Sequence, residues 1–167
     1  LYIAQSPETL HGLQQMAVIE STESSNRLEG VVVPAHRLKS LVLKNAAPRS
    51  RSEQEVAGYR DALGMIHESG EQMPFSEGTV LQLHGILYRY MPQPGGCWKA
   101  TNNDIIERHP DGSSRIRFHP VAAHLTPMAI ADLIRRYREA LDQHLADPLV
   151  LVPLVVLDFL CIHPFPD

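Results

Sequence analysis

Apolar side chains recur three or four residues apart along much of the chain, which is the spacing of a helix with one buried face. The residues that share a helical face in the first half are Leu38, Leu41 and Val42, then Val56, Tyr59 and Leu63, then Val80, Leu83, Leu87 and Tyr90. The sequence Pro-Gln-Pro-Gly-Gly at 92–96 breaks the last of these segments. The spacing predicts a chain built mainly of helices.

Residues that cap helices stand beside several of these segments. Ser6 is followed by Pro and Glu, which supply a capping oxygen, a proline for the first turn and an acid at the positive end of the helix dipole. We expect this helix to run to about Leu28 and to end at Gly30, because glycine commonly follows a helix. Ser52 and Glu55 have the spacing of a capping box, so we expect another helix to begin there.

The pattern changes to a period near two on both sides of residues 109–114, His-Pro-Asp-Gly-Ser-Ser. Ile106 and Arg108 precede this segment, and the alternating residues 115–118 follow it. A Pro-Asp-Gly turn between two alternating segments is typical of a β-hairpin. We therefore predict one small hairpin in an otherwise helical chain.

Two further helices are predicted after the hairpin. The first begins at Thr126 and is amphipathic: its apolar positions are Ile130, Leu133, Ile134, Tyr137 and Leu141, and its outward positions are Arg135, Arg136 and Glu139. The second begins at Asp147 and has apolar residues on every face, which predicts a helix surrounded by others. Its apolar run, 149–162, is shorter than the roughly 20 residues of a membrane span, so we expect no membrane association.

Composition narrows the class of protein. A chain of 167 residues with 44% hydrophobic residues can form one domain with a real core. The formal net charge of −4 argues against a nucleic-acid-binding surface. Two cysteines, Cys97 and Cys161, make no disulfide framework, and no basic-then-apolar segment opens the chain. We therefore expect no signal peptide and a cytoplasmic location.

The last ten residues, Asp-Phe-Leu-Cys-Ile-His-Pro-Phe-Pro-Asp, carry the candidate chemistry. Pro164 disfavours helical geometry at His163, so the final helix should end there and fix the imidazole. A histidine titrates near neutral pH and is suited to act as a general base. Asp167 is a candidate ligand for a hard cation such as Mg²⁺. The alternative is a plain helix end, where the charge of His163 complements the dipole. The ten residues alone leave both interpretations open.

His-Pro-Phe-Pro-Asp resembles the first half of the Fic-family signature, His-Pro-Phe-x-Asp/Glu-Gly-Asn-Gly-Arg. Three earlier segments resemble Fic proteins in the same order. Residues 24–30, Ser-Ser-Asn-Arg-Leu-Glu-Gly, are similar to the inhibitory motif Ser/Thr-x-x-x-Glu-Gly, with matches at Ser25, Glu29 and Gly30. Residues 58–63 resemble the segment ahead of the core, and 95–105 with the following hairpin resemble the flap that lines the target-binding cleft.

The resemblance implies a mainly α fold, a Fic-type helical bundle with one small β-hairpin as its flap. It implies an N-terminal inhibitory helix at 1–30 and a Fic core at 31–167. The implied activity is transfer of AMP from ATP to a hydroxyl of a target protein. ATP and Mg²⁺ are the cofactors implied, with His163 as general base, Asp167 as metal ligand and Phe165 as the aromatic that fixes the loop. Trp98, Lys99, Asn103 and Ile105 match flap positions where an extended target segment would add beside a strand edge.

The remaining Gly-Asn-Gly-Arg half of the signature would follow Asp167. We therefore expect the core to be incomplete at its C-terminus and the chain as given to bind ATP with Mg²⁺ poorly. The expected partner is a target protein with an exposed hydroxyl, with no membrane or nucleic-acid partner, and a homodimer is left open. The alternative function is a catalytically incomplete Fic-like interaction or nucleotide-binding module.

Individual residues also have simpler interpretations. Glu29 fits the inhibitory role, but most helical glutamates only face solvent. In some Fic proteins the matching glutamate also orients water for removal of AMP, so the direction of reaction stays open. Trp98 is as often a packing residue as a target contact. The nine histidines include His109, His119 and His124, and none has the spacing of a zinc site.

Overall fold

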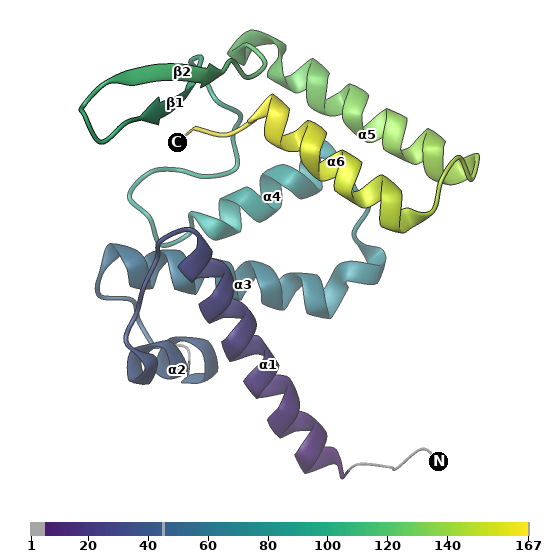
Figure 1. The fold of residues 1–167 in the computed structure, drawn as a ribbon. Helices are drawn as coiled ribbons and strands as arrows, with labels where there is room; N and C mark the ends of the chain where they lie inside the picture. Colours follow the sequence, from purple (N-terminus) through teal and green to yellow (C-terminus); the bar gives the residue numbers. More distant parts are fainter. Residues whose placement is uncertain (1–5, 45, 167) are drawn as a thin grey trace. The chain divides into compact units, whose positions relative to one another are not determined.

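The computed structural model describes residues 6–44 and 46–166, and no side-chain detail is given for Pro7 and Lys44. Within these ranges the chain is mainly helical, as predicted (Figure 1). The helices are α1 (Pro7–Leu28), α2 (Ala35–Lys44), α3 (Arg51–Ser69), α4 (Glu77–Leu87), α5 (Thr126–Asp142) and α6 (Pro148–Ile162). A short 3₁₀ turn, η1 (Gly70–Gln72), follows α3, and another, η2 (Ala123–Leu125), precedes α5. Strands β1 (Ile105–Arg108) and β2 (Ser114–Phe118) form the predicted hairpin.

The chain divides into two compact units. The first contains everything up to Met73 together with Gln82–Gly96. The second contains Pro74–Leu81 and the chain from Cys97 onward. Helix α4 is shared, because its first turn belongs to the second unit and the rest of it to the first.

Helix α1 of the first unit has the ends that the sequence predicts. The Ser6 hydroxyl accepts a hydrogen bond from the backbone N–H of Thr9, which satisfies one of the unpaired donors at the helix start. The last helical residue is Leu28, and Gly30 has φ +78°, a conformation that costs glycine little. The Val31 N–H then reaches back to the Asn26 carbonyl and closes the helix end.

The core of the first unit lies between α1, α2 and α3. Its buried residues are Leu38, Leu41 and Val42 of α2 and Val56 of α3, all at positions that the helical spacing placed on a common face. Tyr59 and Leu63, predicted on the same face as Val56, are half-buried. Each buried side chain of this size contributes roughly 1.5–3 kcal/mol to folding.

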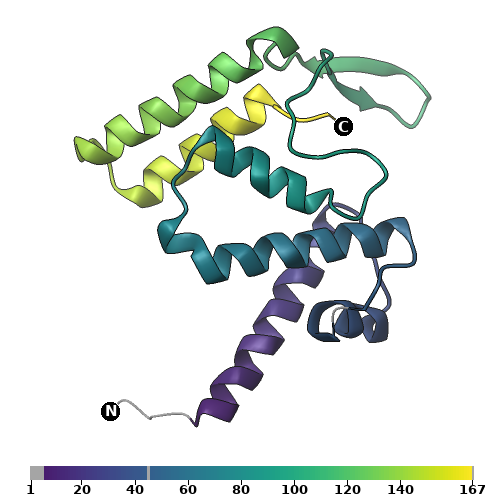
Figure 2. The same ribbon diagram turned by 180° about the vertical axis from the view of Figure 1, so that it is seen from behind.

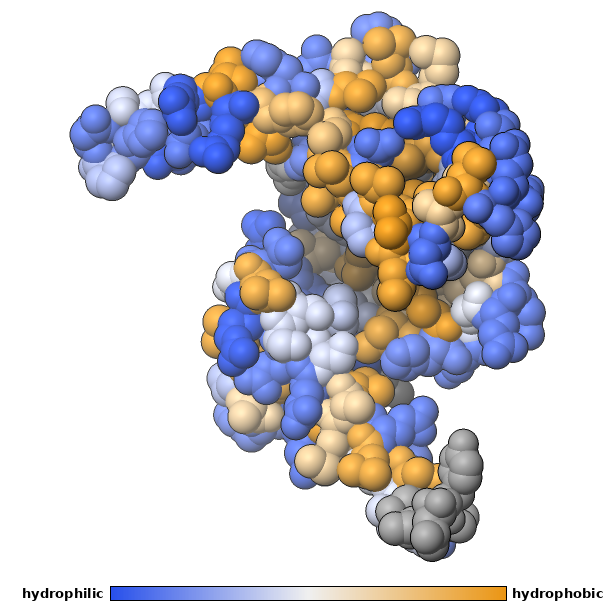
Figure 3. Space-filling model, turned by 45° about the vertical axis from the view of Figure 1, so that its right-hand side comes forward, coloured by the Kyte–Doolittle hydropathy of each residue, from blue (hydrophilic) through white to orange (hydrophobic). Residues whose placement is uncertain are grey.

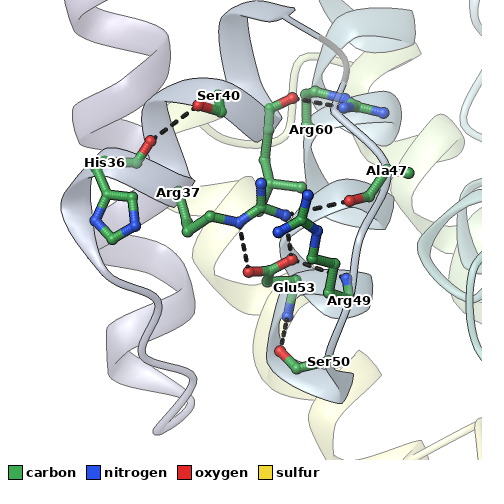
Figure 4. Close-up of polar contacts among 9 residues, drawn as sticks. His36, Arg37, Ser40, Ala47, Arg49, Ser50, Glu53 and Arg60 are labelled. Atoms are coloured by element: carbon green, nitrogen blue, oxygen red, sulfur yellow. Dashed lines mark hydrogen bonds and ion pairs between the residues drawn. The ribbon is translucent and has the colours of Figure 1, made fainter.

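Helix α3 begins earlier than the sequence predicts. Its N-cap is Ser50, whose hydroxyl accepts from the Glu53 N–H at 3.3 Å, so the expected capping box at Ser52 and Glu55 is wrong by two residues. The Ser50 cap is favoured because it places the Glu53 side chain beside three further donor groups, which come from two other residues. Its carboxylate binds the Arg37 guanidinium through two bonds of 2.6 and 2.8 Å and accepts the Arg49 N–H at 2.8 Å (Figure 4).

In the second unit α5 and α6 lie side by side, as both ribbon views show (Figures 1 and 2). Ile130, Leu133 and Ile134 of α5 pack with Ile162 of α6 in a buried cluster, so the predicted inner face of α5 is confirmed. The hairpin is antiparallel, with Ile106 opposite Ile116 and Arg108 opposite Ser114. Gly112 has φ +83° in its turn.

Helix α6 differs from its prediction, because it is not surrounded by other helices. Only Leu151 and Ile162 of its residues are fully buried. Seven apolar residues of α6 are about half exposed or more: Leu149, Val150, Val152, Leu154, Val156, Leu157 and Leu160. Figure 3 colours apolar residues orange and shows many of them on the face that it draws. A helix that is apolar on every face could be buried on every face. Within the described part of the second unit, however, α5 is the helix that packs along α6. No helix in the described ranges is both long and apolar enough to cross a membrane.

Candidate functional site

His163 lies at the end of α6, where the sequence places it. The helix stops at Ile162, and the His163 N–H donates to the Phe159 carbonyl at 3.0 Å as the closing bond. His163 itself has φ +48° and ψ +67°, the left-handed conformation that non-glycine residues rarely adopt. Such a residue costs on the order of 1–3 kcal/mol, and a left-handed residue is also a common way to end a helix. The backbone therefore holds this imidazole in a defined place.

A buried lysine holds the end of the same helix. Lys99 is 4% exposed, and its Nζ donates to the Ile162 carbonyl at 3.1 Å. Its backbone N–H donates to the Pro164 carbonyl at 2.8 Å. The carbonyls at a helix C-terminus lack intrahelical partners and carry the negative end of the dipole. Lys99 therefore ties the residues on both sides of His163 to the segment that leads into the hairpin.

Asn103 connects Lys99 to the imidazole. Its Oδ1 accepts from the Lys99 Nζ at 2.9 Å, and its Nδ2 lies 2.7 Å from the His163 Nδ1. The same Nδ2 lies 3.4 Å from the Phe165 carbonyl. The side chains of Lys99, Asn103 and His163 are all buried or half-buried. The contacts bring together three residues that the sequence singled out separately.

Aromatic side chains support the loop after α6. The Trp98 and Phe165 rings stack with centroids 5.4 Å apart and planes inclined by 23°. Phe159 of α6 contacts Phe165 edge-on at 6.1 Å. A hollow beside them is lined by Phe159, Leu160, His163, Pro164, Phe165 and Pro166. Offset aromatic stacking contributes about 0.5–1.5 kcal/mol beyond area burial, so Trp98 stabilises the loop that carries His163.

The predicted flap residues now have defined positions. Trp98, Lys99 and Asn103 contact the end of α6, and Ile105 is the first residue of β1, opposite Phe118. In the described chain β1 has β2 on one side and no strand on the other. The role of these four residues in binding a target stays a prediction. What the sequence missed is that Lys99 and Asn103 hold the histidine, because a contact across about 60 positions leaves no local signal.

The predicted inhibitory residues lie in the first unit at the end of α1. Ser25 accepts a hydrogen bond from the Tyr59 hydroxyl at 3.0 Å. Glu29 is exposed and follows the last helical residue, and Gly30 takes the left-handed conformation described above. The motif therefore has a structural use in ending the helix, and its inhibitory role stays a prediction.

The predicted metal ligand, Asp167, lies outside the described residues. Among the residues that the structure does describe, no group of three or more His, Cys, Asp or Glu side chains is placed to hold a metal ion. The Mg²⁺ site consequently stays a prediction.

Solved structures with the same fold are known. The chain is similar to a Fic domain containing signaling protein from Bacteroides thetaiotaomicron, with a TM-score of 0.79 and 22% identity over 99% of this chain and 62% of that one. It is also similar to a Fic family protein from Desulfovibrio desulfuricans, with a TM-score of 0.70 and 20% identity over 99% of this chain and 48% of that one. No family model matches the sequence. No curated protein matches it either.

At these identities the likeness shows the fold alone, and that fold is the Fic fold, mainly helical with an antiparallel β-hairpin. The chain spans less than two thirds of the length of each of these two proteins.

Proposed function

We propose, with the Fic fold as the premise, that this protein transfers AMP from ATP to a hydroxyl of a target protein. The observation that carries the proposal is His163, an imidazole held in a left-handed backbone at a helix end by Lys99 and Asn103. General-base catalysis needs a fixed imidazole that can reach the proton of the attacking hydroxyl.

The chemistry is a substitution at the α-phosphorus of ATP. The target hydroxyl oxygen forms a bond to that phosphorus, the bond from it to the bridging oxygen breaks, and pyrophosphate leaves. His163 takes the hydroxyl proton as the new bond forms. Mg²⁺ would neutralise phosphate charge, and Asp167 is the residue proposed to hold it. The free edge of β1 is proposed to bind an extended target segment by backbone hydrogen bonds, which would position the hydroxyl.

Replacement of the imidazole tests the proposal. His163→Asn should lower AMP transfer by at least about 100-fold, the typical cost of losing a general base. Asparagine tolerates the left-handed conformation, so the fold should survive. The measurement is label transfer from α-labelled ATP by the full-length natural protein, to itself or to a target. His144→Asn is the matched control, because His144 also has a left-handed backbone, with φ +52°, just beyond the end of α5.

Undiminished transfer by His163→Asn would remove this residue from the mechanism. A wild-type protein that binds ATP and transfers no AMP would favour the alternative, a Fic-like nucleotide-binding or interaction module.

Inhibition by Glu29 is the second part of the proposal. Its carboxylate is proposed to compete for the positive charge that binds the γ-phosphate, so that ATP binds with its α-phosphorus misaligned. Glu29→Gly should raise AMP transfer on the order of 100-fold, because misplacement by about an ångström costs a similar factor. Glu29 follows the last helical residue, so glycine there should cost less than the roughly 1 kcal/mol that it costs inside a helix.

The matched control is Glu20→Ala, which removes an exposed carboxylate from the body of α1. Equal or lower transfer by Glu29→Gly would leave Glu29 as a residue of the helix end. A drop in transfer together with accumulation of modified target would indicate the reverse reaction, removal of AMP.

A further inference from the structure

The amide of Asn103 has one neighbour that can only donate a hydrogen bond. Lys99 carries an ammonium group, which has three N–H donors and no acceptor. Its Nζ lies 2.9 Å from the Asn103 Oδ1, and burial of the lysine to 4% exposure keeps this contact away from competing water. The amide oxygen must therefore point at Lys99, because the opposite orientation would bring two donors together.

The other end of the amide has a neighbour that can only accept. The Phe165 carbonyl lies 3.4 Å from the Asn103 Nδ2. An asparagine amide that faces a donor on one side and an acceptor on the other has one satisfactory orientation. Lys99 and Phe165 together fix it.

The fixed amide then decides which ring nitrogen of His163 carries a proton. The Asn103 Nδ2 donates to the His163 Nδ1 over 2.7 Å, so that nitrogen must offer its lone pair. In a neutral imidazole the proton is then on Nε2. We infer that Lys99 and Asn103 are positioning residues that hold His163 in the Nε2–H tautomer, with Nδ1 as the nitrogen that accepts the proton in catalysis.

The catalytic half of this inference rests on the proposed function. The target hydroxyl would replace the Asn103 N–H as the donor to Nδ1, and its proton would move to Nδ1 as the oxygen bonds to phosphorus. Asn103 thus occupies the position of the attacking hydroxyl. Because Asn103 lies two residues before β1, the hydroxyl would approach from the flap side of the imidazole.

The tautomer of His163 can be measured without an assay of AMP transfer. The full-length natural protein is labelled with ¹⁵N-histidine, and ring nitrogen shifts are recorded at about pH 8.5, two units above an ordinary histidine pKa. Loss of one set of signals in His163→Asn assigns His163. We expect Nε2 to be protonated and Nδ1 to have the shift of an unprotonated nitrogen. A proton on Nδ1 in the wild type would overturn the inference.

Four variants test the cause. Asn103→Asp has no N–H to donate, so the proton should move to Nδ1. Lys99→Met removes one of the two groups that orient the amide, so part of the population should change to the Nδ1–H tautomer. Lys99→Arg keeps a donor and should keep the wild-type tautomer. Asn102→Asp is the matched control: it makes the same change one residue earlier and keeps the oxygen that accepts from the Ala123 N–H. If Lys99→Met does not fold, Asn103→Asp carries the test. An unchanged tautomer in Asn103→Asp would overturn the inference.

AMP transfer by the same variants tests the catalytic half. Asn103→Asp should lower AMP transfer by about 100-fold, because the lone pair of His163 is then on Nε2. Asn102→Asp should transfer AMP as well as the wild type. Full activity of Asn103→Asp with a reversed tautomer would overturn Nδ1 as the proton acceptor. The two proposals can also fail separately. The expected tautomer in a protein that transfers no AMP would refute the proposed function and leave the positioning by Lys99 and Asn103 intact.

Discussion

His84 is a second histidine whose state is set by its surroundings. It lies on α4, is 4% exposed, and its Nδ1 accepts the Gly96 N–H at 2.9 Å. The Tyr88 ring packs beside it with centroids 4.5 Å apart. Burial lowers the pKa of His84 from its ordinary value of 6.5, because the charged ring would lose its hydration. The neutral ring is thus part of what joins the Gly95–Gly96 turn to α4.

Stability of the first unit should therefore depend on pH through His84. Because the pKa of His84 is lower in the folded than in the unfolded protein, its contribution is present above about pH 6.5 and is lost as the pH falls through the folded-state pKa. The measurement is the urea midpoint between pH 8 and pH 5. His84→Gln should flatten the fall over this range, and His67→Gln, at an exposed histidine of α3, should leave it as in the wild type. An equally steep fall in His84→Gln would contradict the assignment.

For single residues, the sequence predicts those features that residues adjacent in the chain determine. Pro164 indicates that the helix ends at His163, because the restriction acts on the adjacent residue. Lys99 had no such signal, since lysine is rarely buried and its acceptor, the Ile162 carbonyl, is 63 residues away. Asn103 and Lys99 were identified through family resemblance, and only the structure shows that both bind the end of α6.

Two glycines of α3 show how closely elements approach. A Cβ on Gly58 would overlap the carbonyl oxygen of Leu87 and lie 2.7 Å from its carbonyl carbon, so α3 and the end of α4 touch at this glycine. Gly64, less than two turns later in the same helix, has nothing within 4 Å of such a Cβ. Glycine at position 58 is required by the backbone contact, whereas at position 64 it only weakens the helix.

The same substitution at the two sites should therefore have opposite effects. Gly58→Ala should lower the free energy of unfolding by about 1–3 kcal/mol, because the backbones must move apart. Gly64→Ala should raise it by up to about 1 kcal/mol, the difference in helix propensity. Urea unfolding of the two variants measures both. Loss of stability in Gly64→Ala, or none in Gly58→Ala, would refute the packing described for α3.

Helix ends were predictable because caps act locally, as at Ser6 and Gly30. The start of α3 was misplaced because Ser50 and Ser52 both offer a capping hydroxyl, and the choice between them depends on Arg37, which belongs to another helix. The surroundings of α6 were also mispredicted. Its composition shows which faces can be buried, and contacts with distant elements decide which of them are.

For the molecule as a whole, resistance to acid should depend in particular on the carboxylate of Glu53. The bond from Arg37, and to a lesser degree the Arg49 N–H, lowers the pKa of Glu53 to about 2. A carboxyl group with a depressed folded-state pKa contributes stability that is present above its ordinary pKa of 4.5 and is lost as the pH falls toward 2. With a formal net charge of −4 near neutrality, the chain also gains positive charge over the same range.

Glu53→Gln should therefore lower stability by about 2 kcal/mol at neutral pH, the usual worth of a hydrogen bond to a charged group. Its difference from the wild type should shrink as the pH falls from 4.5 toward 3. Glu55→Gln is the control, because its ion pair with Arg51 lies at the surface and should contribute under about 1 kcal/mol. Unfolding by urea across this pH range provides the measurement, and a constant difference would contradict the shifted pKa of Glu53.

The left-handed backbone at His163 also has a consequence for the evolution of this chain. Glycine and asparagine tolerate that conformation better than histidine does, so position 163 is a place where heat resistance and chemistry are in conflict. In a library randomised at this codon, selection for survival on heating alone should enrich glycine and asparagine. A lineage that keeps histidine there is one in which natural selection favours the imidazole over the more stable alternatives.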